Sequence, residues 1–303
     1  MKITSSFALL AFFYFTIAIC TPAAQAQEQV PLRLVRDTFA VVSIQVNGQG
    51  PFDFILDTGT DTTIVDSDLA LRLQLVPIDR LTLSTPGGKQ ILARSWVRSL
   101  VVGSATLPDV EVLVQDSSSL KQLDSRIRGI LGLNFFSHFN FLLDYRRRSL
   151  RFEAANELRD STQGEHVSLG TAGGKMLVES EIRSGGETKA LLLLDSGINE
   201  MVLFRKGENL RRAPSSMQMT VSGPVAAQQN MNVGLIETLR IGKLEFRDLR
   251  FAFLRGRVDG RSADVYTEDV RAEDGLLPTA LFRALYVNNR EGFVVFNPKF
   301  EKS

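Results

Sequence analysis

Apolar residues in this chain gather in short runs that end at turn-forming residues. Phe39–Val46 is rich in β-branched side chains and stops at Asn47-Gly48, a pair typical of tight hairpins. Many short strands separated by turns are typical of closed or sandwiched sheets, so the pattern predicts an all-β fold. The other strands that we expect are Phe52–Leu56, Ser95–Val102, Val110–Val114, Leu150–Phe152, Met176–Ile182, Ala190–Leu194, Met217–Val221, Leu235–Ile241, Leu249–Leu254 and Phe293–Phe296. The expected helices are short and cover Asp66–Leu73, Phe135–Phe139 and Thr279–Leu285.

The sequence repeats itself once along its length. The aligned pairs are Asp57 with Asp195, Ile44 with Ile182, Gly59 with Gly197, and Gly129-Ile130-Leu131 with Gly275-Leu276-Leu277. The spacing grows late in the second copy, which predicts an insertion in the polar stretch 256–274, where added residues cost little free energy. Two copies suggest two lobes related by a pseudo-twofold axis. We expect the first lobe to cover residues 27–156 and the second to cover residues 157–303.

The N-terminal residues 1–26 have the features of a secretory signal peptide. Lys2 precedes an apolar stretch from Phe7 to Cys20, and Ala24-Gln25-Ala26 is typical of a cleavage site. That stretch is shorter than the roughly 20 apolar residues that cross a bilayer as a helix. We therefore expect an exported protein, periplasmic or secreted, with no membrane contact beyond this segment. An uncleaved anchor and a lipoprotein acylated at Cys20 are the two alternatives.

The composition argues against several classes of function. The 303 residues carry a formal net charge of +1, without a basic stripe or a nucleic-acid motif, so we expect no nucleic-acid partner. Cys20 is the only cysteine, so the mature chain would have neither a disulfide nor a thiol nucleophile. The two histidines, His138 and His166, lack the spacing of metal ligands, and we expect no metal site and no cofactor.

The strongest chemical signal is an aspartate that directly follows an apolar strand in both copies. The first copy reads FILDTGT at residues 54–60, and the second reads LLLDSGI at residues 192–198. Glycine after the aspartate lets backbone N–H groups approach the carboxylate, and the neighbouring hydroxyls add donors. A single Asp-Thr-Gly is a common turn. Two of them at equivalent places of a repeat favour a functional pair, Asp57 and Asp195.

On these motifs the chain resembles the pepsin and retropepsin superfamily of aspartic proteases. The resemblance covers about Phe39 to Pro298 and is closest over Phe54–Val65 and Gly129–Gly132. It implies an all-β fold of two pseudo-symmetric acid-protease lobes, each a closed β-barrel-like unit, with a cleft between them. It also implies an endopeptidase that hydrolyses peptide or protein substrates with an activated water, without metal, cofactor or covalent intermediate.

The resemblance assigns the catalytic roles to Asp57 and Asp195, which would meet at the lobe interface. Two carboxyl groups held close together cannot both ionise easily, as the known aspartic proteases show, so the resemblance implies that one acts as general acid and the other as general base. The sequence leaves open which residue takes which role. Thr58 and Ser196 would each bond to the opposite loop. The supporting residues that the resemblance implies are Thr58, Gly59, Thr60, Ser196 and Gly197.

A glycine-containing hairpin is the candidate cover for the substrate. It spans Leu83–Ala93 and has Pro86, Gly87 and Gly88 at its tip, a combination suited to a hairpin that bends. The segment contains no tyrosine, unlike pepsin-like flaps, and is more similar to a retropepsin flap. The alternative is an ordinary surface hairpin.

Two departures from the family pattern lie in the second copy. Ile198 stands where the first copy has Thr60, which removes a hydroxyl donor, and Pro278 stands where the first has Gly132. These departures keep two alternatives open: a catalytically silent peptide-binding protein, and an enzyme active only as a homodimer that pairs Asp57 with Asp57 of another chain. Our leading expectation is a monomer whose single active site contains both aspartates.

Overall fold

The computed structural model describes residues 29–85, 88–116, 118–153, 162–170, 172–204, 218–221, 229–253 and 273–300, without the side chains of 82–85, 88–90, 173, 218, 229 and 300. The expected signal peptide, the hairpin tip at Pro86 and Gly87, most of the expected insertion and the expected lobe boundary at residues 156–157 lie outside this part. Among the described residues, no helix is long and apolar enough to cross a membrane.

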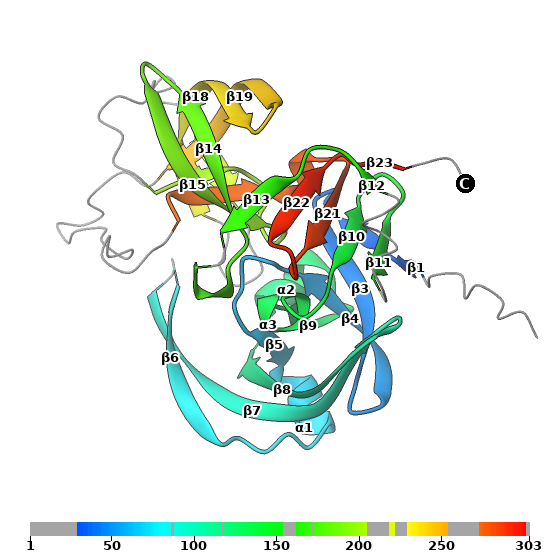
Figure 1. Ribbon diagram of the computed structural model, residues 1–303. Coiled ribbons are helices and arrows are strands. Elements are labelled where there is room, and N and C mark those ends of the chain that lie inside the picture. The colour runs from blue at the N-terminus through cyan, green and yellow to red at the C-terminus, as the bar shows by residue number, and fades with distance from the viewer. Residues whose placement is uncertain are drawn as a thin grey trace, which may run out of the picture.

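The first lobe is a closed ring of six strands. Its hydrogen-bonded order is β3, β4, β9, β5, β8, β7 and back to β3 (Figure 1). The elements of this lobe are β2 (Arg33–Val35), β3 (Phe39–Val46), β4 (Gln49–Leu56), β5 (Thr63–Asp66), α1 (Ser67–Arg72), β6 (Asp79–Thr85), β7 (Gly88–Val102), β8 (Ala105–Gln115), α2 (Ser118–Leu123), β9 (Ile127–Leu131) and α3 (Leu133–Phe136). Closing the ring leaves few unpaired edges and encloses an apolar interior.

The second lobe closes a ring in the same order. Its strands follow β14, β15, β20, β16, β19, β18 and return to β14. The elements of this lobe are η1 (Ala172–Gly174), β14 (Leu177–Arg183), β15 (Glu187–Asp195), β16 (Val202–Leu203), β17 (Gln218–Val221), β18 (Gln229–Ile241), β19 (Leu244–Phe253), β20 (Gly275–Pro278) and η2 (Thr279–Leu281). The predicted all-β fold with two similar closed lobes is therefore confirmed.

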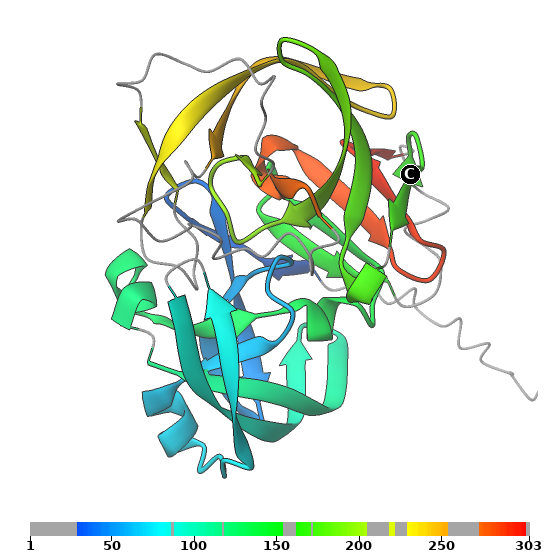
Figure 2. The same ribbon diagram turned by 90° about the vertical axis from the view of Figure 1, so that its left-hand side faces the viewer.

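A third sheet joins the two lobes and is built from both halves of the chain. Its order is β1 (Gln29–Pro31), β11 (Ser149–Phe152), β10 (Phe141–Asp144), β21 (Ala284–Asn288), β22 (Phe293–Phe296) and β13 (Val167–Gly170). Strand β10 from the first half pairs antiparallel with β21 from the second. A further short antiparallel pair, β12 (Thr162–Gln163) with β23 (Lys299–Phe300), lies close to this sheet (Figures 1 and 2). We call this six-stranded layer the shared sheet.

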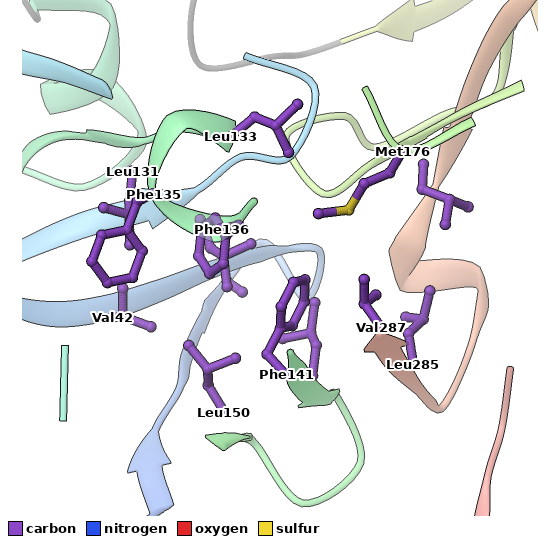
Figure 3. Close-up of a cluster of buried hydrophobic side chains, with 14 of the residues drawn as sticks. Val42, Leu131, Leu133, Phe135, Phe136, Phe141, Leu150, Met176, Leu285 and Val287 are labelled. Carbon is purple, nitrogen blue, oxygen red and sulfur yellow. The ribbon is translucent and has the colours of Figure 1, made fainter. Parts of the chain in front are cut away.

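The hydrophobic core is continuous from the lobes into the shared sheet. Figure 3 shows Phe135 and Phe136 of α3 beside Phe141 of β10, with Leu285 and Val287 of β21 on the other side. The ring centroids of Phe136 and Phe141 lie 5.2 Å apart. Burying a side chain of this size contributes on the order of 1.5–3 kcal/mol, so the core ties α3 firmly to the sheet.

The prediction of a helix at Thr279–Leu285 is wrong over most of its length. Residues 279–285 form only the 3-10 turn η2, and the chain becomes strand β21 at Ala284. Ala284–Asn288 pairs with β10 on one side and β22 on the other, and all five residues are buried. Sheet pairing on both edges therefore overrides the local preference for a helix.

Candidate active site

Each candidate catalytic aspartate stands where a buried strand ends. Strand β4 carries the buried run Phe54–Leu56, and the Asp57 N–H then donates to the Leu131 carbonyl of β9 at 3.0 Å. In the second lobe, β15 ends at Asp195, which lies opposite Pro278 in the parallel pairing with β20. The apolar strands thus fix the backbone of both aspartates inside the lobes, and both side chains are buried.

The two loops meet, and the glycine of each loop lies against the aspartate of the other. A Cβ atom added at Gly59 would overlap the Asp195 carboxyl group, and one added at Gly197 would overlap the Asp57 carboxyl group. The structure therefore brings Asp57 and Asp195 together across the lobe interface. Only a residue without a side chain allows this approach, which explains the glycine in each motif.

Thr58 and Ser196 tie the two loops to each other through reciprocal hydrogen bonds. The Thr58 hydroxyl donates to the Leu194 carbonyl at 2.7 Å, and the Ser196 hydroxyl donates to the Leu56 carbonyl at 3.0 Å. The Thr58 N–H donates to the Ser196 hydroxyl at 3.0 Å, and the Ser196 N–H donates to the Thr58 hydroxyl at 3.1 Å. Each such bond stabilises the native state by about 1 kcal/mol, and the four together hold one geometry of the pair.

Asp57 accepts more hydrogen bonds than its partner. Its carboxylate accepts the N–H of Gly59 at 2.9 Å, the N–H of Thr60 at 3.1 Å and the hydroxyl of Thr60 at 2.8 Å. Burial raises the pKa of Asp57 above its ordinary value, and these donors oppose the rise because they stabilise the charged form. Asp57 is thus the better placed of the two to carry the negative charge.

Asp195 occupies a less polar environment. Its carboxyl group accepts the Gly197 N–H at 2.7 Å, and the side chain at the position of Thr60 is the buried, apolar Ile198. Burial raises the pKa of Asp195 well above its ordinary value, and the nearby charge of Asp57 raises it further. The asymmetry seen in the sequence therefore separates the two groups: the donors around Asp57 favour its charged form, and burial beside a second carboxyl group favours the protonated form of Asp195.

The candidate flap is a long hairpin at the edge of the first lobe. Strands β6 and β7 pair from Asp79 opposite Arg94 to Thr85 opposite Gly88, so the hairpin extends beyond the ring toward the second lobe (Figure 1). Gly88 begins β7, whereas Pro86 and Gly87 lie outside the described residues. The structure therefore contains both strands of the predicted hairpin, and the tip of the hairpin lies outside the described residues.

A support for the first loop that no motif singles out comes from Asn134. Its side-chain oxygen accepts both the N–H of Thr63 at 2.9 Å and the hydroxyl of Thr63 at 2.8 Å, and its amide donates to the Glu111 carbonyl at 2.8 Å. The signal in the sequence is its place two residues after Gly132, directly behind the apolar run of β9. Asn134 therefore fastens the end of the first loop to α3.

Charged side chains also lie close to the first loop. Lys175 bonds to both carboxylate oxygens of the buried Glu273 at 3.0 Å, and both residues act on Asp61. Burial raises the pKa of Asp61, the positive charge of Lys175 lowers it and the negative charge of Glu273 raises it. These three residues are far apart in the sequence and belong to no recognisable motif.

Comparison with known proteins finds a family match over the first of the two loops. Residues 42–135, which include the loop of Asp57, match the family model described as aspartyl protease. The chain is also similar to the crystal structure of a retropepsin-like aspartic protease from Rickettsia conorii, with a TM-score of 0.31 and 17% sequence identity over 42% of this chain and 90% of that chain. No curated protein matches the sequence. The family match supports a protease function in general.

Proposed function

We propose that this chain, which belongs to the pepsin and retropepsin-like superfamily of aspartic proteases, is an endopeptidase with one active site formed by Asp57 and Asp195 of the same molecule. The observation that carries the proposal is the contact between the two loops, in which Gly59 packs on Asp195 and Gly197 packs on Asp57. The cross-lobe bonds of Thr58 and Ser196 support pairing within one chain, because the second copy fills the position that another molecule would otherwise supply.

The two aspartates have different roles in the proposed mechanism. Ionised Asp57 removes a proton from water as the water oxygen attacks the carbonyl carbon of the peptide bond, and Asp195 gives its proton to the carbonyl oxygen. The resulting tetrahedral intermediate collapses when Asp57 passes its proton to the amide nitrogen. The C–N bond then breaks, and Asp195 recovers a proton from the hydroxyl that becomes a carbonyl again.

The proposal predicts cleavage of an unstructured polypeptide with a bell-shaped dependence on pH. Activity needs Asp57 ionised and Asp195 protonated, so it falls when the pH drops below the pKa of Asp57 and when it rises above the pKa of Asp195. Because burial raises both pKa values, with Asp195 well above its ordinary value, we expect both limbs at higher pH than exposed carboxyl groups would give. The measurement is kcat/KM for an unfolded protein substrate between about pH 3 and 8.

A second candidate function is peptide binding without cleavage, which the buried Ile198 and the proline at position 278 favour. The same measurement separates the two. Cleavage that follows the expected profile supports the endopeptidase. Binding of an extended peptide without any cleavage across the whole pH range supports the silent binder and contradicts the proposed mechanism.

A further inference from the structure

The first catalytic loop is fastened to the helix behind it by groups of its own lobe. The Gly132 N–H donates to the Thr63 hydroxyl at 3.1 Å, and the Leu133 N–H donates to the Thr60 carbonyl at 2.8 Å. The side chain of Asn134 adds the two bonds to Thr63 described above. These hydrogen bonds therefore join helix α3 directly to the loop.

The second lobe lacks the chemical groups for the same fastening. Pro278 takes the place of Gly132 and has no N–H to donate, and Ala280 takes the place of Asn134. Met201 takes the place of Thr63 and offers no hydroxyl. The loop of Asp195 must therefore be supported in another way.

The first half of the chain supplies a support at that place. The Tyr145 hydroxyl and the Thr279 hydroxyl are hydrogen-bonded at 2.6 Å, and both residues are buried. Thr279 directly follows Pro278, which lies opposite Asp195 in the sheet. The backbone of the same turn reinforces the contact, because the N–H groups of Tyr145 and Arg146 donate to the Arg283 carbonyl at 3.0 and 3.2 Å. Turn η2 behind Asp195 is thus held by a side chain that follows β10.

The second half of the chain makes the reciprocal contact. Asp144 and Asn288 end β10 and β21, and each accepts the N–H of the residue three positions later with its side-chain oxygen. Tyr145 directly follows Asp144, and Asn289 directly follows Asn288, so these two residues occupy equivalent places in the two halves. The Asn289 amide donates to the Phe136 carbonyl at 2.9 Å and to the Phe139 carbonyl at 2.6 Å, at the end of α3. Each half therefore braces the short helix behind the catalytic loop of the other half.

We infer that Tyr145 is a positioning residue for Asp195, bracing the second catalytic loop through Thr279, and that Asn289 is its counterpart for the loop of Asp57. This inference rests on the proposed function, since it names a residue that acts on the same pair of aspartates. Neither side chain touches substrate, and both act through the short helices η2 and α3.

The electrostatics place the Tyr145 hydroxyl near the pair. Burial raises the pKa of Tyr145, the Thr279 bond lowers it and the negative charge of Asp195 raises it again. Asp57 in the neighbouring loop acts on Asp195, and the charge of Asp195 in turn acts on the phenol behind it. The raised pKa keeps Tyr145 neutral through the working range, so its contribution is geometric: it holds the segment behind Asp195 in place through Thr279.

The test replaces Tyr145 by phenylalanine and uses Tyr286→Phe as the matched control. Tyr286 of β21 is also buried, and its hydroxyl donates to Glu153 at 2.9 Å and not to a residue of η2 or α3. In Tyr145→Phe we expect kcat to fall about tenfold with KM nearly unchanged, because a loosened Asp195 is poorly aligned. The basic limb of the pH profile should move to lower pH, since easier access of water lowers the pKa of Asp195. Tyr286→Phe should leave both limbs in place.

A second readout does not depend on cleavage. Amide hydrogen exchange in Tyr145→Phe should become faster in residues 195–201 and stay unchanged in residues 57–63, whereas Asn289→Ala should show the reverse. If both tyrosine variants shift the pH profile and the exchange equally, or neither does, Tyr145 is an ordinary structural residue and the inference is wrong. If wild type never cleaves but the exchange change is confined to residues 195–201, the bracing stands and the proposed function fails.

Discussion

Replacing Asp195 by asparagine is expected to lower kcat/KM for peptide cleavage by about a thousandfold, because the amide cannot hold and return the shared proton. Asparagine has the same shape, and it can still accept the Gly197 N–H, so the fold should persist. Asp57→Asn should lose as much, since the residue that accepts the proton from water is then missing. The measurement is kcat/KM at the optimum pH for each variant, with the thermal midpoint Tm recorded beside it.

A matched control for these variants is Asp144→Asn. Asp144 is also a buried aspartate, it lies in the shared sheet, and the corresponding place in the second half already holds Asn288. We expect this variant to keep wild-type activity. If Asp57→Asn has no activity and Asp195→Asn remains active, Asp195 has only a structural role and Asp57 works with a partner chain.

Gly59→Ala is expected to lower both the activity and the stability of the protein. The added methyl group would overlap the carboxyl group of Asp195, so the two loops must move apart. Overpacking of this kind costs roughly 1–3 kcal/mol of the free energy of unfolding. A displacement of even 1 Å between reacting groups lowers the rate by about a hundredfold, so cleavage should fall at least that far.

Gly186→Ala is the control for the glycine substitution, because a Cβ at Gly186 would meet nothing within 4 Å. It should leave the activity unchanged and the thermal midpoint unchanged or slightly higher. Both variants are compared by thermal unfolding and by kcat. Wild-type activity in Gly59→Ala would contradict the close approach of Gly59 and Asp195, and with it the geometry of the proposed pair.

The fold and the two aspartate loops could be predicted from the sequence because their signals are local. An apolar strand that ends at Asp-Thr-Gly or Asp-Ser-Gly combines burial, a turn residue and a carboxylate within a few positions. The bonds of Thr58 and Ser196 lie where the family resemblance implies them. The difference between Thr60 and Ile198 is also visible in the sequence, and the structure gives it a consequence for the two pKa values.

The remaining features depend on contacts between distant parts of the chain. Tyr145 and Thr279 are 134 positions apart, and neither carries a local signal that links it to a catalytic loop. The helix expected at Thr279–Leu285 gives way to strand β21 because β10 and β22 pair with both of its edges. A shared sheet of this kind can be recognised only when the order of the strands is known.

In the proposed endopeptidase, one chain contains a complete active site. The most direct test measures cleavage per chain over a wide range of protein concentration, with the size of the active species determined in parallel. We predict constant activity per chain and a monomeric active species down to the lowest concentration that the assay detects. Activity that falls with dilution and follows a dimer would contradict the claim, because it would mean that the catalytic pair forms between two molecules.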